Sequence, residues 1–197
     1  NAWGVADRGG AWTVTGGAAA FSVSGGKGLV SLKPADTRES RLSAVSGIST
    51  VVDLQVSSDV AAVGGTTSVT VIGRQVGSAS YSARLRFEPG GAVRVYLVRA
   101  SGSESYLAGG ASYVLPGTYV PGRVVNIRLS VTGESPTSVA TKIWYEGSAE
   151  PSAWQLEATD STAGLQAAGG IGIRHAASSV SVVPVTVLSY DNLKVTT

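Results

Sequence analysis

The sequence predicts an all-β protein, an antiparallel sandwich formed by a single domain over residues 1–197; the pattern leaves a barrel open as the alternative. Three observations predict this class. Short runs rich in valine, isoleucine, threonine and tyrosine alternate apolar with polar residues, as half-buried strands do. Glycine, which supplies 26 of the 197 residues, separates the runs at short intervals and indicates many turns. No long segment repeats apolar side chains at helical spacing.

The strands are expected in an order set by turn residues. Between 161 and 168 the chain is expected to form one helical turn or a loop. Hairpins are expected at 76–80, 88–91 and 133–137, where glycine, proline and serine are concentrated. The expected strands are 11–15, 18–23, 28–32, 40–44, 48–57, 67–75, 80–87, 92–100, 104–108, 124–132, 138–145, 171–175 and 182–195.

Composition excludes several classes of protein. A hydrophobic content of 43% is too high for a disordered chain. The absence of cysteine excludes thiol catalysis, cysteine-zinc sites and disulfides. A formal charge of +2 is too small to predict nucleic-acid binding. Because no run of about 18 apolar residues occurs, no membrane insertion is expected.

Alternation along the strands predicts a polar surface. Successive side chains of a strand point to opposite faces, so in 81–87 Tyr81 and Leu85 share one face while Arg84 and Arg86 share the other. If the strands with this pattern are neighbours in one sheet, their polar side chains form one surface, with Arg74 and His175 at its ends. The predicted ligand-binding residues are Arg74, Arg84, Arg86, Arg94, Tyr96, Arg128, Trp144, Arg174 and His175.

Two interpretations of this surface remain open. Antiparallel sheets commonly have one solvated face, and arginine is frequent there without any ligand. The functional interpretation is a sugar-binding face, where aromatic rings stack on pyranose rings and guanidinium groups hold hydroxyls, carboxylates or sulfates. The excess of arginine favours an acidic glycan. Trp144 is the tryptophan best placed for stacking, because Ile143 and Tyr145 point to the other side.

Several segments resemble a known family. The opening WGVADRGGAWT at 3–13, WQLEATD at 154–160, GLQ at 164–166 and the closing VLSYDNLKV at 187–195 resemble concanavalin A-like, laminin G-like lectin modules. Such modules occur in actinobacterial secreted proteins and actinobacteriophage minor tail proteins. The resemblance implies a jelly-roll of two stacked sheets with glycan binding at the concave one. An Asp-x-Phe strand that often precedes the Trp-Gly pair in this family is absent here.

The resemblance also implies a place and partners for the chain. It implies an extracellular, cell-surface or virion-tail module that binds a polysaccharide or surface glycan beside other modules of the same protein. Many relatives bind one structural calcium, and Asp191 matches their acidic ligand in the last strand. Calcium prefers six to eight oxygen ligands, and the sequence has no dense acidic cluster. A hydrogen-bonded surface carboxylate is therefore the alternative for Asp191.

Catalytic motifs are missing from the sequence. Glycosidases use two carboxylates across the scissile bond, and no two acidic residues lie two apart on an expected strand. His175 is the single histidine, and no Gly-x-Ser-x-Gly turn accompanies it. Three hypotheses follow: a non-catalytic, lectin-like carbohydrate-binding or adhesion module, a structural or assembly sandwich, and a polysaccharide lyase or glycoside hydrolase. The first is the prediction, so no enzyme activity is expected.

Overall fold

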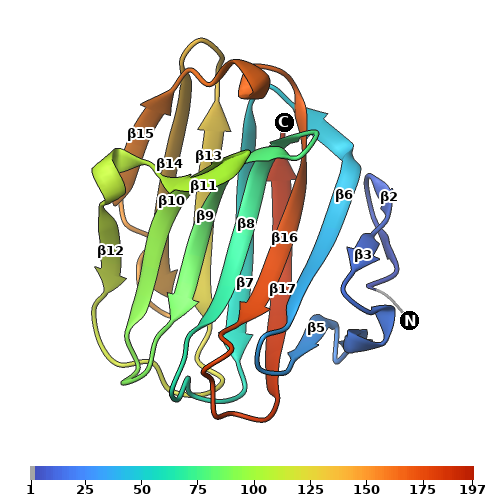
Figure 1. The fold of residues 1–197 in the computed structure, drawn as a ribbon, viewed down its shortest axis with the longest axis vertical. Coiled ribbons are helices and arrows are strands. Elements are labelled where there is room, and N and C mark those ends of the chain that lie inside the picture. The colour runs from blue at the N-terminus through green and yellow to red at the C-terminus, as the bar shows by residue number, and fades with distance from the viewer. Residues whose placement is uncertain (1–2) are drawn as a thin grey trace.

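The computed structural model describes residues 3–197 and has two antiparallel β-sheets packed face to face (Figure 1). The predicted all-β sandwich is confirmed, with jelly-roll topology, and the barrel alternative is excluded. One sheet has eight strands and the other has seven. In Figure 1 the eight-stranded sheet faces the viewer and strand β11 crosses in front of it.

The eight-stranded sheet has the order β11-β10-β9-β8-β16-β6-β3, with β12 paired to β10. The strands β11 and β12 therefore share one edge of β10. Their bounds are β3 Thr13–Thr15, β6 Thr37–Gly47, β8 Thr67–Val76, β9 Ala79–Phe87, β10 Val93–Ser101, β11 Ser103–Tyr106, β12 Ser112–Leu115 and β16 Gly169–Ala177.

The seven-stranded sheet has the order β15-β14-β13-β7-β17-β5-β4. A separate two-stranded ribbon pairs β1 Val5–Ala6 with β2 Gly10–Ala11. The bounds in the seven-stranded sheet are β4 Phe21–Ser24, β5 Lys27–Leu32, β7 Thr50–Ser58, β13 Val125–Thr132, β14 Thr137–Tyr145, β15 Leu156–Asp160 and β17 Thr186–Thr196.

The core lies between the two sheets and is built by alternation. In β13, Val125, Ile127, Leu129 and Val131 are no more than 1% exposed, whereas the residues between them are partly exposed. Strand β9 does the same from the other sheet through Tyr81, whose side chain is fully buried. Each sheet therefore has one apolar inner face and one polar outer face, as the period of two requires.

The three expected hairpins are confirmed. β8 and β9 pair up to Val76 and Ala79, β9 and β10 pair across the turn at 88–92, and β13 and β14 pair up to Thr132 and Ser138. At the second of these turns Gly90 and Gly91 have φ of +85° and +82°. This is the left-handed region, which glycine enters without steric cost.

Some element predictions are wrong. β12 and β15 are missing from the expected strands, because each has only four or five residues and weak alternation. Residues 182–185 belong to a loop, since β17 begins at Thr186. Short 3-10 turns occur at η1 Ala18–Ala20, η2 Ala108–Gly110 and η3 Ala163–Leu165. The first replaces part of an expected strand, and the third lies within the segment 161–168.

Within residues 3–197, no helix is long and apolar enough to span a membrane.

Candidate functional site

A row of polar residues crosses the outer face of the eight-stranded sheet. Arg174 of β16 lies opposite Thr70 of β8, and Thr70 lies opposite Arg84 of β9. Arg84 in turn lies opposite Tyr96 of β10, and Tyr96 lies opposite Ser112 of β12. Directly paired residues of one face have Cβ atoms about 4.5–5.5 Å apart. The register therefore aligns these five residues across five strands.

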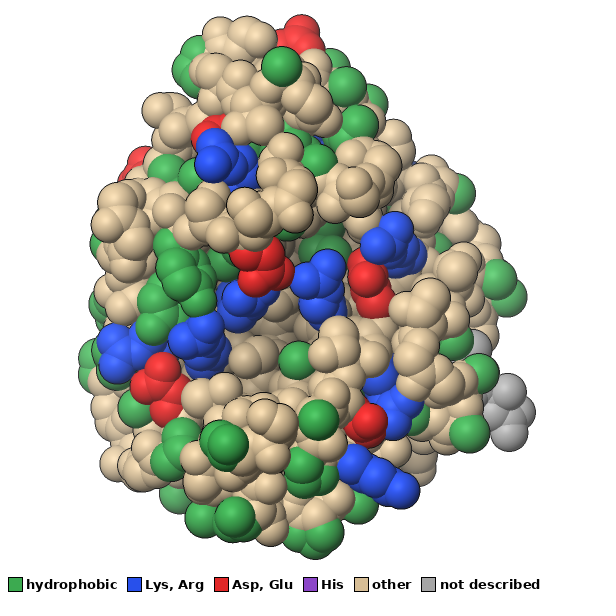
Figure 2. All heavy atoms as spheres, in the orientation of Figure 1, with side chains coloured by type: hydrophobic (Ala, Val, Ile, Leu, Met, Phe, Trp, Pro, Cys, Tyr) green, Lys and Arg blue, Asp and Glu red, His purple; other side chains and the backbone are tan. Residues whose placement is uncertain are grey.

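Small side chains on either side of this row leave the face hollow. Ser68 and Ala176 occupy register positions on one side, where Arg86 lies opposite Ser68, and Ser82 and Gly172 occupy positions on the other, with Ile72 between them. In Figure 2, which has the orientation of Figure 1, this face has a depression with basic and acidic side chains at its floor and walls. The long side chains of the row therefore border a space that their small neighbours do not fill.

Arg86 lies beside two tyrosines at one side of the row. Its guanidinium carbon is 4.9 Å from the ring centroid of Tyr96 and 5.9 Å from that of Tyr106. Its Nη2 donates a hydrogen bond of 2.5 Å to the Tyr106 hydroxyl. The two rings have centroids 4.8 Å apart and are tilted by 34°. Stacked rings beside a cation form a flat, amphipathic surface.

Ion pairs connect the other arginines of this face. Glu104 of β11 accepts hydrogen bonds from Arg84 Nη2 at 2.6 Å and from Arg174 Nη1 at 3.0 Å. Arg94 Nε donates to Glu88 at 3.0 Å. None of the ion pairs within residues 3–197 includes Arg86. Three of the four arginines thus pair with two carboxylates, and we call this surface the cationic face: Arg84, Glu88, Arg86, Arg94, Tyr96, Glu104, Tyr106 and Arg174.

The single predicted surface is wrong for Arg128 and Trp144. Both are on the outer face of the seven-stranded sheet, because β13 and β14 pair with β7 and β15 and with no strand of the eight-stranded sheet. The cationic face and these two residues therefore lie on opposite sides of the sandwich. Alternation predicted correctly that both point outward, but alternation contains no information about which sheet a strand joins.

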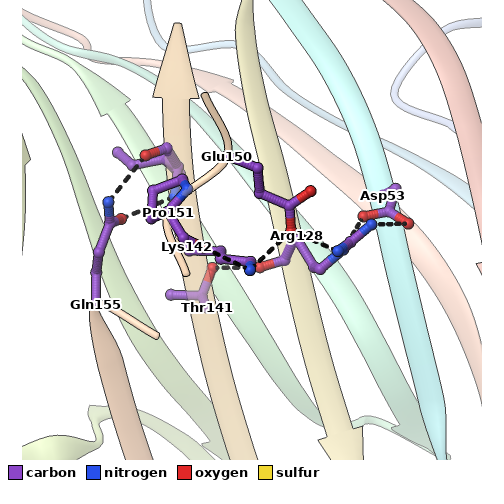
Figure 3. A network of polar contacts seen from close by, with 8 residues as sticks. Asp53, Arg128, Thr141, Lys142, Glu150, Pro151 and Gln155 are labelled. Carbon is purple, nitrogen blue, oxygen red and sulfur yellow. Dashed lines mark hydrogen bonds and ion pairs between the residues drawn. The ribbon is translucent and has the colours of Figure 1, made fainter. Parts of the chain in front are cut away.

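Arg128 belongs to a self-neutralising network (Figure 3). Its Nη2 donates to Asp53 at 3.1 Å, and its Nη1 donates to Glu150. Lys142 Nζ is 2.7 Å from the same Glu150 oxygen and 2.8 Å from the Pro151 carbonyl. Two cations therefore meet two carboxylates. We call this surface the neutral face: Asp53, Arg128, Lys142, Trp144 and Glu150.

A shallow cavity of about 230 Å³ lies beside Trp144 on the neutral face. Its amide side chains already bond one another: Gln55 donates to Asn126 at 3.0 Å and accepts from Asn192 at 2.8 Å. Asn126 also donates to the Trp144 carbonyl at 3.4 Å. These mutual hydrogen bonds occupy the amide groups of the cavity, which Arg128 and Lys194 also line.

The predicted surface position of Arg74 is wrong. A bulge in β8 between Ile72 and Arg74 shifts the register against β9, and a bulge changes which side the following residue faces. The Arg74 side chain is fully buried and donates to Thr137 Oγ1 at 2.7 Å, Leu165 O at 3.0 Å and Gly133 O at 2.8 Å, and also to Ile48 O. Its Nε has no partner among the described residues. Arg74 therefore stabilises one end of the core.

The predicted surface position of His175 is also wrong. It follows Arg174 in β16 and therefore faces inward, where it is fully buried. Its Nδ1 is 2.7 Å from the Tyr190 hydroxyl and its Nε2 is 3.2 Å from Ser40 Oγ. Burial, followed by the charge of Arg38, lowers the pKa of His175 to about 3. The imidazole is neutral at physiological pH and is a core group.

Asp191 lies where the last strand bulges. Its Oδ1 accepts a hydrogen bond of 2.8 Å from the backbone N–H of Asn192, and the register shifts between Asp191 and Lys194. It lines a cavity of about 310 Å³ together with Asp7. No group of three or more histidine, aspartate or glutamate side chains in residues 3–197 is arranged to hold a metal. Two carboxylates supply only part of the six to eight oxygens that calcium prefers, so calcium binding at Asp191 stays a prediction.

Sequence reasoning missed three residues of the cationic face and two of the polar row. Each contacts a predicted arginine or tyrosine: Glu88, Glu104 and Tyr106 of the face, and Thr70 and Ser112 of the row. Alternation in the expected strand 104–108 puts Glu104 and Tyr106 on one side, which is a usable signal. Their opposition to Arg84, Arg86 and Arg174 depends on the hairpin folding over the sheet, and no local pattern predicts that.

Comparisons with solved structures agree with the fold. A carbohydrate-binding module from Bacillus subtilis superposes with a TM-score of 0.59 at 12% identity, covering 94% of this chain and 95% of that one. An alginate lyase from Aplysia kurodai gives 0.59 at 12% identity, over 93% and 89% of the chains. A legume lectin-like domain from Entamoeba histolytica gives 0.57 at 11% identity, over 94% and 89%. At such identities the likeness establishes a shared fold, of the concanavalin A-like and legume lectin-like kind.

No protein-family model matches the sequence, and no curated protein matches it significantly.

Proposed function

We propose that the chain is a non-catalytic carbohydrate-binding module whose ligand lies in the hollow of the cationic face. The observation that carries the proposal is the row from Arg174 through Arg84 to Tyr96, bordered by small residues and backed by the tyrosine pair. Guanidinium forks hold hydroxyl and carboxylate oxygens, and flat aromatic rings accept the apolar face of a sugar. The shared fold with a carbohydrate-binding module and a lectin-like domain supports it.

The ligand class that fits this face is an acidic polysaccharide or surface glycan. Four arginines are opposed by Glu88 and Glu104, while Glu39, which lies opposite Arg174 in β6, is paired with Arg41. Arg86 has hydrogen-bonding and aromatic partners but no carboxylate among the ion pairs of residues 3–197. The face therefore has an excess of positive charge in a partly enclosed space, where electrostatic attraction is stronger than at a flat surface. Neutral glycans offer Arg86 hydroxyls but no negative charge, so they form no ion pair with it.

The context proposed for the module is extracellular. The segments at 3–13 and 187–195 resemble modules of actinobacterial secreted proteins and phage tail proteins, which supports a place beside other modules of a cell-surface, secreted or tail protein. In that setting the module attaches its parent protein to a glycan. Proteins with this fold that act on or bind glycans are consistent with such a role.

A polysaccharide lyase is the second candidate. Solved structures of an alginate lyase and of a glucuronan lyase from Trichoderma reesei share the fold, and Tyr96 and Tyr106 lie beside Arg86 on the cationic face. The sole histidine is buried in the core, where it is unable to reach a ligand in the hollow. This arrangement favours binding without elimination.

A retention experiment tests the proposal. The intact chain is passed over immobilised polygalacturonate and over an uncharged polysaccharide, each with and without calcium. We expect retention on the polyuronate, a loss of at least about fivefold in affinity for Arg86→Ala, and no change for Arg128→Ala, the matched variant on the neutral face. The expected loss is that of one hydrogen-bonded ion pair.

Three outcomes of this experiment overturn the proposal. Absence of binding to any charged or neutral glycan favours the structural or assembly sandwich. An equal loss for Arg86→Ala and Arg128→Ala indicates a non-specific charge effect. The appearance of unsaturated uronate, detected by ultraviolet absorbance, identifies the chain as a lyase.

A further inference from the structure

The hairpin of β10 and β11 brings a carboxylate onto the cationic face. β11 pairs only with β10, through Ser103 to Tyr106, and Gly102 at the turn has a φ of +74°. The strand crosses in front of the eight-stranded sheet (Figure 1) and borders the depression visible in Figure 2. Besides its backbone pairing to β10, the strand contacts the sheet through Glu104, which accepts from Arg84 and Arg174, and through Tyr106, whose hydroxyl accepts from Arg86.

The carboxylate is that of Glu104, and one of its oxygens accepts two hydrogen bonds. Oε1 is 2.6 Å from Arg84 Nη2 and 3.0 Å from Arg174 Nη1. The Arg84 side chain is 14% exposed and the Glu104 side chain is 41% exposed. Oε2 of Glu104 has no hydrogen bond to the residues described here. Glu104 therefore bridges two strands that are separated by β8.

The Glu104 carboxyl group stays ionised in this position. Burial alone would raise the pKa of its carboxyl, but the hydrogen bonds from Arg84 and Arg174 and their charges outweigh burial and lower that pKa below its ordinary value. At neutral pH the two guanidinium groups thus hold a full negative charge from the protein itself. Arg86, two residues after Arg84, has no such occupant.

This inference rests on the proposed function. We propose that Glu104 is an internal competitor, a carboxylate from the chain that occupies the Arg84–Arg174 pair where a uronate carboxylate of the ligand binds. An entering ligand first contacts Arg86 and the tyrosine pair, which carry no internal carboxylate. It then displaces Glu104, whose side chain turns away from the two arginines while Tyr106 and the backbone pairing of β11 to β10 stay in place.

Competition by Glu104 makes the site prefer ligands with several closely spaced carboxylates over ligands with one. A ligand with one carboxylate gains the Arg84–Arg174 pair only by giving up an equivalent pair within the protein, so it gains little. A polyuronate also occupies Arg86 and holds the displaced state through neighbouring carboxylates. For a ligand that needs the Arg84–Arg174 pair, the observed affinity is the intrinsic affinity multiplied by the fraction of molecules in which Glu104 has left the pair.

Glu104→Gln tests this inference, with polygalacturonate and an uncharged polysaccharide as probes. The amide keeps the size of the side chain and loses the charge, so the competitor is weakened. We expect affinity for polygalacturonate to rise on the order of tenfold, with no gain for the uncharged probe. The control is Glu157→Gln, which changes net charge equally at an exposed position of β15. Thermal unfolding of each variant verifies folding.

The outcomes separate this inference from the proposed function. Wild-type binding with an unchanged or weaker Glu104→Gln variant overturns the competitor and leaves the proposed function intact, because Glu104 then only positions the arginines. An equal gain for Glu157→Gln also overturns it, since net charge then explains the result. Absence of binding by both wild type and Glu104→Gln overturns the proposed function and the inference together. Binding gained only by Glu104→Gln supports both.

Discussion

The cationic face and the neutral face are built by the same strand pattern and differ in what surrounds their arginines. Arg128 on the neutral face lies between Asp53 and Glu150, and Lys142 shares Glu150 with it. On the cationic face Arg84 and Arg174 share one glutamate, and Arg86 lies against tyrosine rings. The first arrangement satisfies its own charges, whereas the second leaves positive charge over a hollow. Outward-facing arginine is thus common to both, and only the balance of neighbouring charge distinguishes them.

His175, the single histidine of the sequence, belongs to neither face because it is buried in the core. Folding lowers the pKa of His175 from 6.5 to about 3. As the pH falls, this histidine is therefore protonated in the unfolded chain before it is protonated in the folded one. Stability from the neutral imidazole is complete above pH 6.5 and is lost as the pH falls toward 3, by about 5 kcal/mol at most. We expect His175→Gln to remove this part of the acid dependence, measured by urea unfolding at pH 7 and pH 4. An unchanged slope would place the histidine at the surface.

Removing two cationic groups from each face compares the function of the two faces most directly. We expect Arg84→Gln with Arg86→Gln to weaken polyuronate binding on the order of a hundredfold, or about 2.7 kcal/mol, because both charged groups face the hollow. The matched pair is Arg128→Gln with Lys142→Gln on the neutral face, for which affinity should change by less than about twofold. Titration calorimetry at fixed salt measures both. Equal losses would show that the two faces do not differ in function.

Substitutions on the neutral face should lower the free energy of unfolding more than substitutions on the cationic face, which is the reverse of their expected effects on binding. On the neutral face, Asp53→Asn removes the partner that Arg128 contacts through two nitrogens, and we expect a loss of about 1 kcal/mol in the free energy of unfolding. On the cationic face, Arg86→Gln removes a charge among like charges, so we expect a change within about 0.5 kcal/mol. Urea denaturation at low salt compares the two. A larger loss for Arg86→Gln would contradict the assignment of the neutral face as the self-stabilised one.

The smallest effect is expected at Trp144. It lies beside a cavity whose amide groups already bond one another, so Trp144→Ala should change glycan affinity by less than about twofold. Tyr96→Ala on the cationic face is its counterpart, and we expect that variant to lose about tenfold, the value of one stacking ring at a ligand. Retention on immobilised polyuronate measures both variants. A greater loss for Trp144→Ala would move the site to the neutral face.

The sequence predicted the parts of the site that depend on alternation. Within β9 the outward direction of Arg84 and Arg86 follows from the burial of Leu85 and its alternate neighbours, and the structure confirms it. The same rule applied to β16 predicts that His175 faces inward with Ile173, so the surface position assigned to it contradicted the pattern. Arg74 is different, because the bulge after Ile72 reverses the facing of the residues that follow.

The sequence by itself determined the class of the fold and which side chains of each strand face outward, because the two-residue period and turn-forming glycines act within a few residues. Only the tertiary structure decided which strands share a sheet, and hence that Arg84 and Arg174 meet whereas Arg128 lies on the opposite side. It also placed Glu104 between those two arginines. The reason is that sheet order and the folding of a hairpin over a sheet depend on contacts between residues 20 to 70 positions apart, which no local pattern encodes.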